Sequence, residues 1–283
     1  MKKIAIGPIL EDLNSKGFDY VVTKYALTTG EVLGILEDYV SREHLDARLS
    51  KYRTLLNQRM TLTSLKGSRF GLISDTHIGN KKARWDYIKA AYDFFYYNDV
   101  AAVIHLGDLF DGVESSNNFQ TNRDKARHSF EKQLKEFKLN YPKKLPTYLL
   151  LGNHDEWFRQ FGYDLFEELP AKNSSMKVLD YGGYRIRLNG NLFYLSHPIN
   201  NGYCVTNKGC VVILRGHSHY FEYNKQRSLF RLNTCSDTHP NPAGGDYALA
   251  GGFSLLSFPK KNICFENYSF YHDDIVKSLC LKL

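Results

Sequence analysis

The spacing of apolar side chains changes near residue 67. In residues 4–65 apolar positions recur at intervals of three and four, as Val32, Ile35 and Tyr39 do, and this repeat is typical of an amphipathic helix. Beyond Arg69, short apolar runs alternate with longer amphipathic stretches. The pattern predicts a small all-α domain, residues 1–66, followed by a domain of strands and helices, residues 67–283.

The second domain is predicted to begin with buried, mostly parallel strands that alternate with helices. The expected elements in order are FGLIS (70–74), ARWDYIKAAYDFFYY (83–97), VAAVIHL (100–106), RDKARHSFEKQLKEF (123–137) and TYLLL (147–151). Strands then dominate: YRIRL (184–188), LFYLS (192–196), VVILR (211–215), LFRLN (229–233), GFSLLSF (252–258) and ICFEN (263–267). A hairpin turn is expected at residues 189–191. We therefore predict an α/β fold of four layers, in which mixed central β sheets form a sandwich flanked by helices.

Residues 17–40 are similar to a helix-turn-helix, with Thr28 or Thr29 as the N-cap of a second helix that starts at Glu31. A helix that reads DNA bases usually presents Arg, Lys, Asn or Gln, whereas this one presents Glu37 and Asp38. An accessory or oligomerisation domain is therefore favoured over direct base recognition. The small, polar stretch Thr61–Ser68 is predicted to be the linker.

Every cluster of chemically reactive residues in the second domain directly follows an apolar strand. The clusters are Asp75-Thr76-His77, Gly107-Asp108-Leu109-Phe110-Asp111, Gly152-Asn153-His154-Asp155, His197 and Gly216-His217-Ser218-His219. Ligands of open α/β sheets bind at the carboxyl ends of strands, where side chains from separate strands meet. The five clusters are therefore expected to form one site.

The residue types in these clusters indicate a metal centre. Carboxylates, imidazoles and an amide, with no thiolate, suit divalent Mn, Fe or Zn. Alternate residues of a strand share a face, so Asp75 and His77 can bind the same ion. Asp108 is the candidate bridge between two ions, because its two oxygens can each hold one. Glycines at 107, 152 and 216 leave room for sharp turns beside the metals.

As an ordered set, DxH, GDxxD, GNHD, a single His and GHxH resemble the calcineurin-like metallophosphoesterase superfamily from Arg69 onward. The resemblance implies two divalent ions, with Mn expected first and Fe, Zn, Mg or Ni as alternatives. It implies a first ion on Asp75, His77, Asp108 and His219, and a second on Asp108, Asn153, His197 and His217. It also implies that His154 protonates the leaving oxygen or stabilises the transition state and that Asp155 orients His154, with Asp111 outside the ligand set. Such ions lower the pKa of a shared water, which gives the attacking hydroxide at neutral pH.

The family acts on many phosphoesters. The segments SDTHIG, HLGDLFDG and GNHD look most like the DNA-repair exonuclease and phosphodiesterase branch, so nucleic acid is the expected substrate. Small nucleotides or phosphomonoesters are the alternative, and a catalytically silent scaffold is a third. A nuclease needs cations and aromatic rings near its metals. The candidates are Lys81, Lys82, Arg84, Trp85, Arg123, Lys125, Arg127, Trp157, Phe158, Arg159 and Phe161. The loop 237–252 is also expected near the site.

Composition narrows the picture only a little. The net charge of +7 suits an anionic substrate, although acidic and basic residues are interleaved. The odd number of cysteines, five without CxxC spacing, predicts reduced thiols. Pro8, Glu11 and Asp12 interrupt the N-terminal apolar run, and no stretch reaches the roughly 20 apolar residues of a membrane span. We therefore expect a cytoplasmic protein that does not bind membranes.

The remaining histidines fall outside these motifs. His105 lies within a predicted strand and is expected to be a hydrogen-bonded core residue beside the site. Surface or packing roles are expected for His44, His128, His239 and His272.

Overall fold

The computed structural model describes residues 8, 9, 11, 12, 16, 18–25, 32, 62–113, 119–198, 212–236, 251–260, 262–271 and 274–283. The chain divides into two units, Met1–Thr61 and Leu62–Leu283. Only a small part of the first unit is described, so the expected capping residues Thr28 and Thr29 and most of the helix-turn-helix lie outside the described residues.

In the first unit, helix α2 (Phe18–Tyr25) buries Val21 completely. Asp12 is 7% exposed and accepts hydrogen bonds from Lys24 (2.5 Å) and the Tyr25 hydroxyl (2.7 Å). These donors, Lys24 first, hold the pKa of Asp12 well below its usual range. A helix is therefore confirmed within the predicted helical segment.

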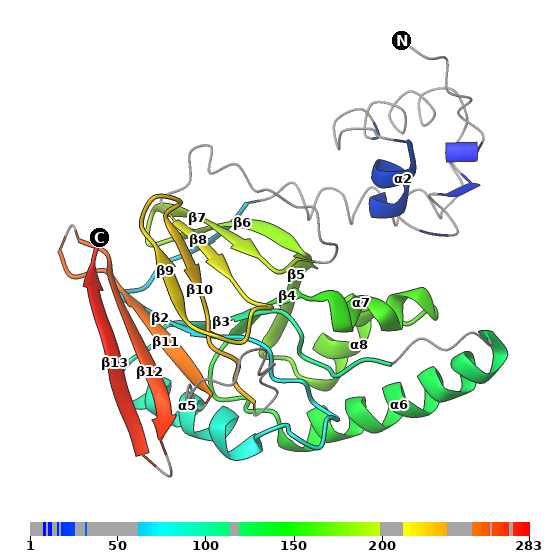
Figure 1. Ribbon diagram of the computed structural model, residues 1–283, viewed down its shortest axis with the longest axis horizontal. Helices are drawn as coiled ribbons and strands as arrows, with labels where there is room; N and C mark the ends of the chain where they lie inside the picture. Colours follow the sequence, from blue (N-terminus) through cyan, green and yellow to red (C-terminus); the bar gives the residue numbers. More distant parts are fainter. Residues whose placement is uncertain are drawn as a thin grey trace, which may run out of the picture. The chain divides into compact units, whose positions relative to one another are not determined.

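Two mixed sheets form the second unit (Figure 1). The seven-stranded sheet has the order β13-β12-β11-β2-β3-β4-β5, and its strands are β2 (Arg69–Ile73), β3 (Ala102–Leu106), β4 (Thr147–Leu151), β5 (Met176–Tyr181), β11 (Gly252–Ser257), β12 (Cys264–Tyr271) and β13 (Asp274–Lys282). The six-stranded sheet has the order β1-β6-β7-β8-β10-β9, and its strands are β1 (Thr63–Leu65), β6 (Gly183–Leu188), β7 (Asn191–Ser196), β8 (Val212–Arg215), β9 (Glu222–Asn224) and β10 (Leu229–Arg231). Strands β2 to β5 are parallel, as the alternation with helices predicts.

Four helices accompany the sheets in the described part of this unit: α5 (Trp85–Tyr97), α6 (Phe119–Asn140), α7 (Asn153–Gln160) and α8 (Leu165–Lys172). One apolar core lies between them and the seven-stranded sheet, where α5 and α6 bury Phe95 and Phe137. A second core lies between the two sheets and contains Phe193 and Phe265. The α/β sandwich with flanking helices is thus confirmed. A helical layer over the other face of the six-stranded sheet is not among the described residues.

The region around the predicted linker differs from the prediction. Thr63–Leu65 is strand β1, which pairs in parallel with β6 and aligns Thr63 with Ile186. A polar three-residue strand that pairs with a segment more than 120 residues away has no local signal. The predicted hairpin between β6 and β7 is confirmed, with Asn189 and Gly190 both at positive φ. No described helix is long and apolar enough to cross a membrane.

Candidate metal centre

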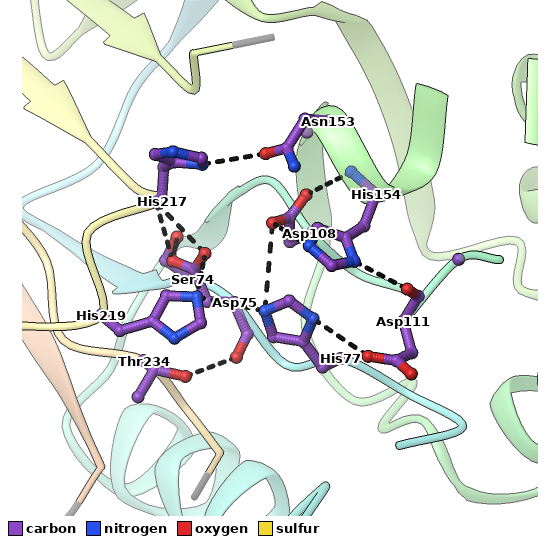
Figure 2. Close-up of polar contacts among 12 residues, drawn as sticks. Ser74, Asp75, His77, Asp108, Asp111, Asn153, His154, His217, His219 and Thr234 are labelled. Carbon is purple, nitrogen blue, oxygen red and sulfur yellow. Dashed lines mark hydrogen bonds and ion pairs between the residues drawn. The ribbon is translucent and has the colours of Figure 1, made fainter. Parts of the chain in front are cut away.

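Residues of the predicted reactive clusters lie close together and point toward one another (Figure 2). Residues after β2, β3 and β4 come from the seven-stranded sheet, and residues after β7 and β8 come from the six-stranded sheet. The alignment of β2 with β3 continues past their ends, because the backbone N–H of Asp75 donates to the Gly107 carbonyl (2.9 Å) and that of His77 to the Asp108 carbonyl (3.1 Å). This pairing brings the DxH and GDxxD loops together.

The first group of possible ligands is Asp75, His77, Asp108 and His219, which offer atoms within 4.8 Å of one another. His219 Nε2 lies 3.2 Å from Asp75 Oδ1 and 3.2 Å from His77 Nε2. His77 Nε2 lies 3.9 Å from Asp108 Oδ2. Two carboxylates and two imidazoles therefore point into one small volume. We call this group the closed cluster, because three of its members are buried.

The second group is Asp108, His197 and His217, which also offer atoms within 4.8 Å of one another. His197 Nε2 lies 3.2 Å from Asp108 Oδ2. Asn153 joins them, since its Oδ1 lies 3.1 Å from His197 Nε2 and 2.9 Å from His217 Nδ1. His217 is exposed, so we call these four residues the open cluster. Asp108 belongs to both clusters.

The protonation of His197 tests whether the open cluster fits a cation. Its Nδ1 lies 2.6 Å from the Leu106 carbonyl, which can only accept, so Nδ1 carries a proton and Nε2 faces the oxygens of Asp108 and Asn153. Burial would lower the pKa of His197, but the charge of Asp108 outweighs burial and raises it to about 9. A positive charge is therefore favoured at this point. A divalent ion supplies one, and the nitrogen and oxygen donors suit Mn, Fe or Zn.

The closed cluster also favours positive charge. Burial would raise the pKa of Asp75, but His219 outweighs it and the pKa is lowered. The Asp75 carboxylate also accepts the backbone N–H of His217 at 3.0 and 3.1 Å. Burial would also raise the pKa of Asp108, but the charge of His197 outweighs burial, and the pKa of Asp108 is lowered. Both carboxylates are therefore ionised and ready to bind a cation at neutral pH.

The backbone is strained at the clusters. In the described part of the chain, nine residues other than glycine have positive φ, and five of them are at the site. They are Asp75 (φ 54°), His77 (φ 46°), Asp108 (φ 51°), His217 (φ 79°) and His219 (φ 59°). Such conformations cost about 1–3 kcal/mol each and gather at functional sites. The strain indicates that these side chains are directed inward by the surrounding fold.

Two glycines make room for the ligands. A Cβ on Gly152 would lie 2.2 Å from Asp108 Oδ1, and one on Gly107, at φ +94°, would lie 2.3 Å from His197 Nδ1. Either side chain would displace a ligand. Both glycines were expected at the site, and the structure places them against the side chains of the possible ligands.

His154 stands beside both clusters. Its Nε2 lies 4.0 Å from Asp108 Oδ2, its Nδ1 lies 2.7 Å from the Asp111 carbonyl, and its ring is 4.4 Å from that of Trp157. Figure 2 shows the ring between Asp108 and Asp111. The imidazole is 27% exposed, so it can meet a substrate.

The role expected for Asp155 is corrected. Its carboxylate accepts the backbone N–H groups of Gly152 (2.8 Å), Phe110 (2.9 Å) and Leu109 (3.2 Å). Burial, and then the charge of Asp108, raise the pKa of Asp155. The residue thus joins the GNHD loop to the GDxxD loop, and the group that holds the His154 ring is the Asp111 carbonyl. Because the partner is a backbone atom, no side-chain pattern indicates it.

The Asp111 carboxylate forms a third group of possible ligands with His77 and His154, whose atoms lie within 4.8 Å of one another, so its expected place outside the ligand set stays a prediction. Its Oδ1 lies 3.5 Å from His77 Nδ1 and accepts a hydrogen bond from Asn80 (2.8 Å). A carboxylate at this position of an imidazole fixes which ring nitrogen faces an ion. His77 Nε2 is therefore the nitrogen directed at the closed cluster.

Two hydroxyl residues beside Asp75 were not anticipated. The Ser74 hydroxyl lies 2.5 Å from Asp75 Oδ2 and 3.1 Å from the Leu106 carbonyl. The Thr234 hydroxyl donates to the Asp75 carbonyl at 2.7 Å. Ser74 could have been noticed as the last residue of FGLIS, whereas Thr234 follows a strand with no motif.

Several expected neighbours of the site have structural roles. Arg84 pairs with Asp86, Arg159 pairs with Glu156, and Phe158 is fully buried in the core. Lys81 and Lys82 are exposed beyond the DxH loop. The side chains of Arg123, Lys125 and Arg127, and the loop 237–250, lie outside the described residues.

The other singled-out residues are mostly buried or exposed as expected. His105 is fully buried, its Nε2 lies 3.2 Å from the Thr76 hydroxyl, and burial lowers its pKa to about 3, so it stays neutral. His128 is exposed. Cys235, Cys264 and Cys280 are free thiols. Cys204, Cys210, His44, His239 and His272 lie outside the described residues.

A family profile matches the part of the chain that contains most of these residues. The sequence profile of the family described as calcineurin-like phosphoesterase matches residues 68–221, more than half of the chain. A search of curated proteins found no match. Among solved structures, vacuolar protein sorting 29 of Cryptosporidium parvum aligns at 13% identity and a TM-score of 0.44, over 77% of this chain and 98% of that chain. Wild-type Vps29 of Entamoeba histolytica, in complex with Zn²⁺, aligns at 10% identity and a TM-score of 0.42, over 76% and 98%.

Proposed function

Because the chain belongs to the calcineurin-like phosphoesterase family, we propose that it is a hydrolase of phosphodiester bonds that uses two divalent ions and acts on nucleic acid. The observation that supports this proposal best is the position of Asp108. Its Oδ2 lies 3.2 Å from His197 Nε2 and 3.9 Å from His77 Nε2, which belong to different clusters. One carboxylate between two sets of imidazoles is the arrangement that a dinuclear centre requires.

Bound divalent ions supply the Lewis acidity that polarises a phosphoryl oxygen and activates water. The protein's own groups supply orientation and proton transfer. The backbone N–H of His154 donates to Asp108 Oδ1 (2.9 Å), which leaves Oδ2 directed at both clusters. The Asp111 carbonyl holds the Nδ1–H group of His154, so Nε2 faces the site and, when the ring is the doubly protonated imidazolium, can deliver its proton to the leaving oxygen.

The substrate class rests on the surroundings of His154. Trp157 packs beside it at 4.4 Å and offers a ring on which a base can stack. Lys81 and Lys82 follow the DxH loop and are exposed, and the net charge of +7 favours a polyanion. The motif style of SDTHIG, HLGDLFDG and GNHD, similar to that of the DNA-repair exonuclease branch, adds to this proposal.

One observation favours a smaller substrate. Arg84 and Arg159, which were candidates for contacts with a phosphate backbone, are engaged with Asp86 and Glu156. With these cations neutralised, a small nucleotide or a phosphomonoester becomes the second candidate.

The test is hydrolysis by metal-stripped protein after addition of Mn²⁺. Labelled single-stranded and double-stranded DNA and RNA are compared with nucleotides, bis(4-nitrophenyl) phosphate and 4-nitrophenyl phosphate, with Asp108→Asn as the control. Cleavage of a polynucleotide by the wild type alone supports the nuclease. Turnover of small esters alone moves the protein to the second candidate, and no turnover with any divalent ion contradicts both.

A further inference from the structure

A single peptide group links the His154 ring to helix α6. This group joins Asp111 to Gly112, and its other contact is the side chain of Gln133. We infer that Gln133 is a positioning residue for His154: it fixes this peptide group, whose carbonyl in turn fixes the imidazole. The inference rests on the proposed function, in which His154 protonates the leaving oxygen.

The imidazole end of the link defines the tautomer of His154. Its Nδ1 lies 2.7 Å from the Asp111 carbonyl oxygen. A carbonyl has no hydrogen to donate, so Nδ1 must carry the proton. The site-facing nitrogen is then Nε2, 4.0 Å from Asp108 Oδ2. If the carbonyl turned away, neither the ring angle nor the tautomer would be fixed.

The Gln133 end of the link consists of four hydrogen bonds. Its Oε1 accepts the backbone N–H of Asp111 (3.1 Å), which also donates to the Ile78 carbonyl, and that of Gly112 (3.3 Å). Its Nε2 donates to the Gly112 carbonyl (3.0 Å) and to the Ser129 hydroxyl (2.6 Å). The Gly112 N–H and the Asp111 carbonyl belong to one planar peptide. Rotation of that peptide would therefore break its bond to Gln133 and its bond to His154 together.

The Asp111–Gly112 peptide needs to be held in place because one of its residues is glycine. Gly112 has φ +76°, and a Cβ there would lie 2.7 Å from both the His154 carbonyl and Trp157 Cε3. Glycine is required for this close approach, but it also permits the preceding peptide to reorient. Gln133 restrains the peptide through the hydrogen bond that its Oε1 accepts from the Gly112 N–H.

Gln133 is itself held firmly. The residue is 4% exposed, and a Cβ on Gly79 would lie 2.3 Å from its Cγ. Its oxygen faces two N–H groups while its nitrogen faces a carbonyl and a hydroxyl, so the amide has one favourable orientation. A buried polar side chain with three hydrogen bonds to a catalytic loop is suited to positioning.

The test compares three substitutions at Gln133. Gln133→Met keeps the length and packing but removes every hydrogen bond. Gln133→Glu keeps an oxygen that can accept the two N–H groups. Gln133→Asn shortens the side chain, so its amide stays polar but is drawn back from the loop. Ser129→Ala is the matched control, because Ser129 bonds Gln133 Nε2 and the Gly112 carbonyl but neither end of the Asp111–Gly112 peptide.

The rate of hydrolysis of two aryl esters, bis(4-nitrophenyl) phosphate and diphenyl phosphate, is to be measured for each protein. Proton donation matters more for phenol, the poorer leaving group. In Gln133→Met, kcat for the phenyl ester should fall roughly tenfold more than kcat for the nitrophenyl ester, as part of the roughly 10²- to 10⁴-fold that a positioned acid contributes. Gln133→Glu should restore most of this difference, and the Mn content should not change. An equal loss on both esters, or no loss, would overturn the inference.

A measurement on ¹⁵N-histidine-labelled protein does not depend on turnover. The ring nitrogen shifts of His154, assigned with His154→Gln and recorded in the neutral form of the ring, should report a proton fixed on Nδ1 in the wild type and in Ser129→Ala, and a mixture of tautomers in Gln133→Met and Gln133→Asn. A fixed tautomer in every folded variant would overturn the inference. If the wild type hydrolyses neither these esters nor a polynucleotide or nucleotide, the proposed function fails, and the tautomer still decides whether Gln133 positions His154.

Discussion

The closed and open clusters use similar ligands but differ in their contact with solvent. In the closed cluster the side chains of Asp75, His77 and His219 are 0%, 3% and 14% exposed. In the open cluster His197 is fully buried, whereas His217 is exposed. The two clusters share Asp108, so one ion would be held within the protein and the other would face the substrate. Solvent contact at the second position is what a hydrolytic centre needs, because water and phosphate must both reach it.

The largest loss of bound metal and of activity is expected for a substitution at Asp108, which belongs to both clusters. Asp108→Asn removes the charge that each cluster requires, so we expect loss of at least one ion. Activity should fall by more than the roughly 10²- to 10⁴-fold that a positioned acid contributes, because the ion that activates water is lost. Elemental analysis and turnover of bis(4-nitrophenyl) phosphate measure both effects. Retention of two ions at full occupancy would contradict the shared role.

A smaller loss of activity is expected for a substitution at His154. This residue lies beside both clusters and belongs to neither proposed ligand set. His154→Ala should keep the metal content and lower turnover of esters with poor leaving groups by roughly 10²- to 10⁴-fold, because it removes the proton donor. Turnover of nitrophenyl esters should change less. Full activity on phenyl esters would show that His154 is not the acid.

The open cluster should bind metal in a pH-dependent way. The pKa of His197 is raised to about 9, so below this pH an ion must displace a proton from Nε2. Mn²⁺ affinity at the open cluster should therefore rise, by up to about tenfold per pH unit, between pH 7 and pH 9 and level off above. Calorimetry in buffers of different ionisation enthalpy measures the proton released. Binding without proton release at pH 7 would show that His197 Nε2 carries no proton that the ion must displace.

The smallest effect is expected from a hydroxyl behind the closed cluster. Thr234→Val removes the hydrogen bond to the Asp75 carbonyl, so the free energy of unfolding should fall by about 0.5–1.5 kcal/mol. Metal affinity at the closed cluster should weaken severalfold. Ser254→Ala is the matched control, because it removes a buried hydroxyl that bonds Asn267 elsewhere. An equal loss of metal affinity in both variants would show that the effect is general destabilisation.

The sequence predicted most of the frame of the second unit. Apolar runs such as FGLIS and TYLLL became strands β2 and β4, because continuous apolar segments are buried on both faces of a parallel sheet. The strand ends then identified the reactive clusters. Their convergence could be anticipated because parallel strands finish at one edge.

Other features could not be predicted because they depend on contacts between distant segments. Pairing of Thr63 with Ile186 leaves no local pattern. The positive φ of Asp75 and His77 reflects constraint by the whole fold, since neither residue type requires it. The carbonyl that holds His154 and the N–H group that Gln133 holds are main-chain groups, so no residue type in the sequence indicates them.

The origin of the ligands in two different sheets has a consequence for folding. Asp75, His77 and Asp108 follow strands of one sheet, whereas His197, His217 and His219 follow strands of the other. An ion held between them acts as a cross-link that forms only after both sheets have come together. Ion binding should therefore select the assembled sandwich over the unfolded chain, by about 2.7 kcal/mol at a free ion concentration 100 times the Kd. Metal supply would then set the lifetime of the folded protein as well as its activity.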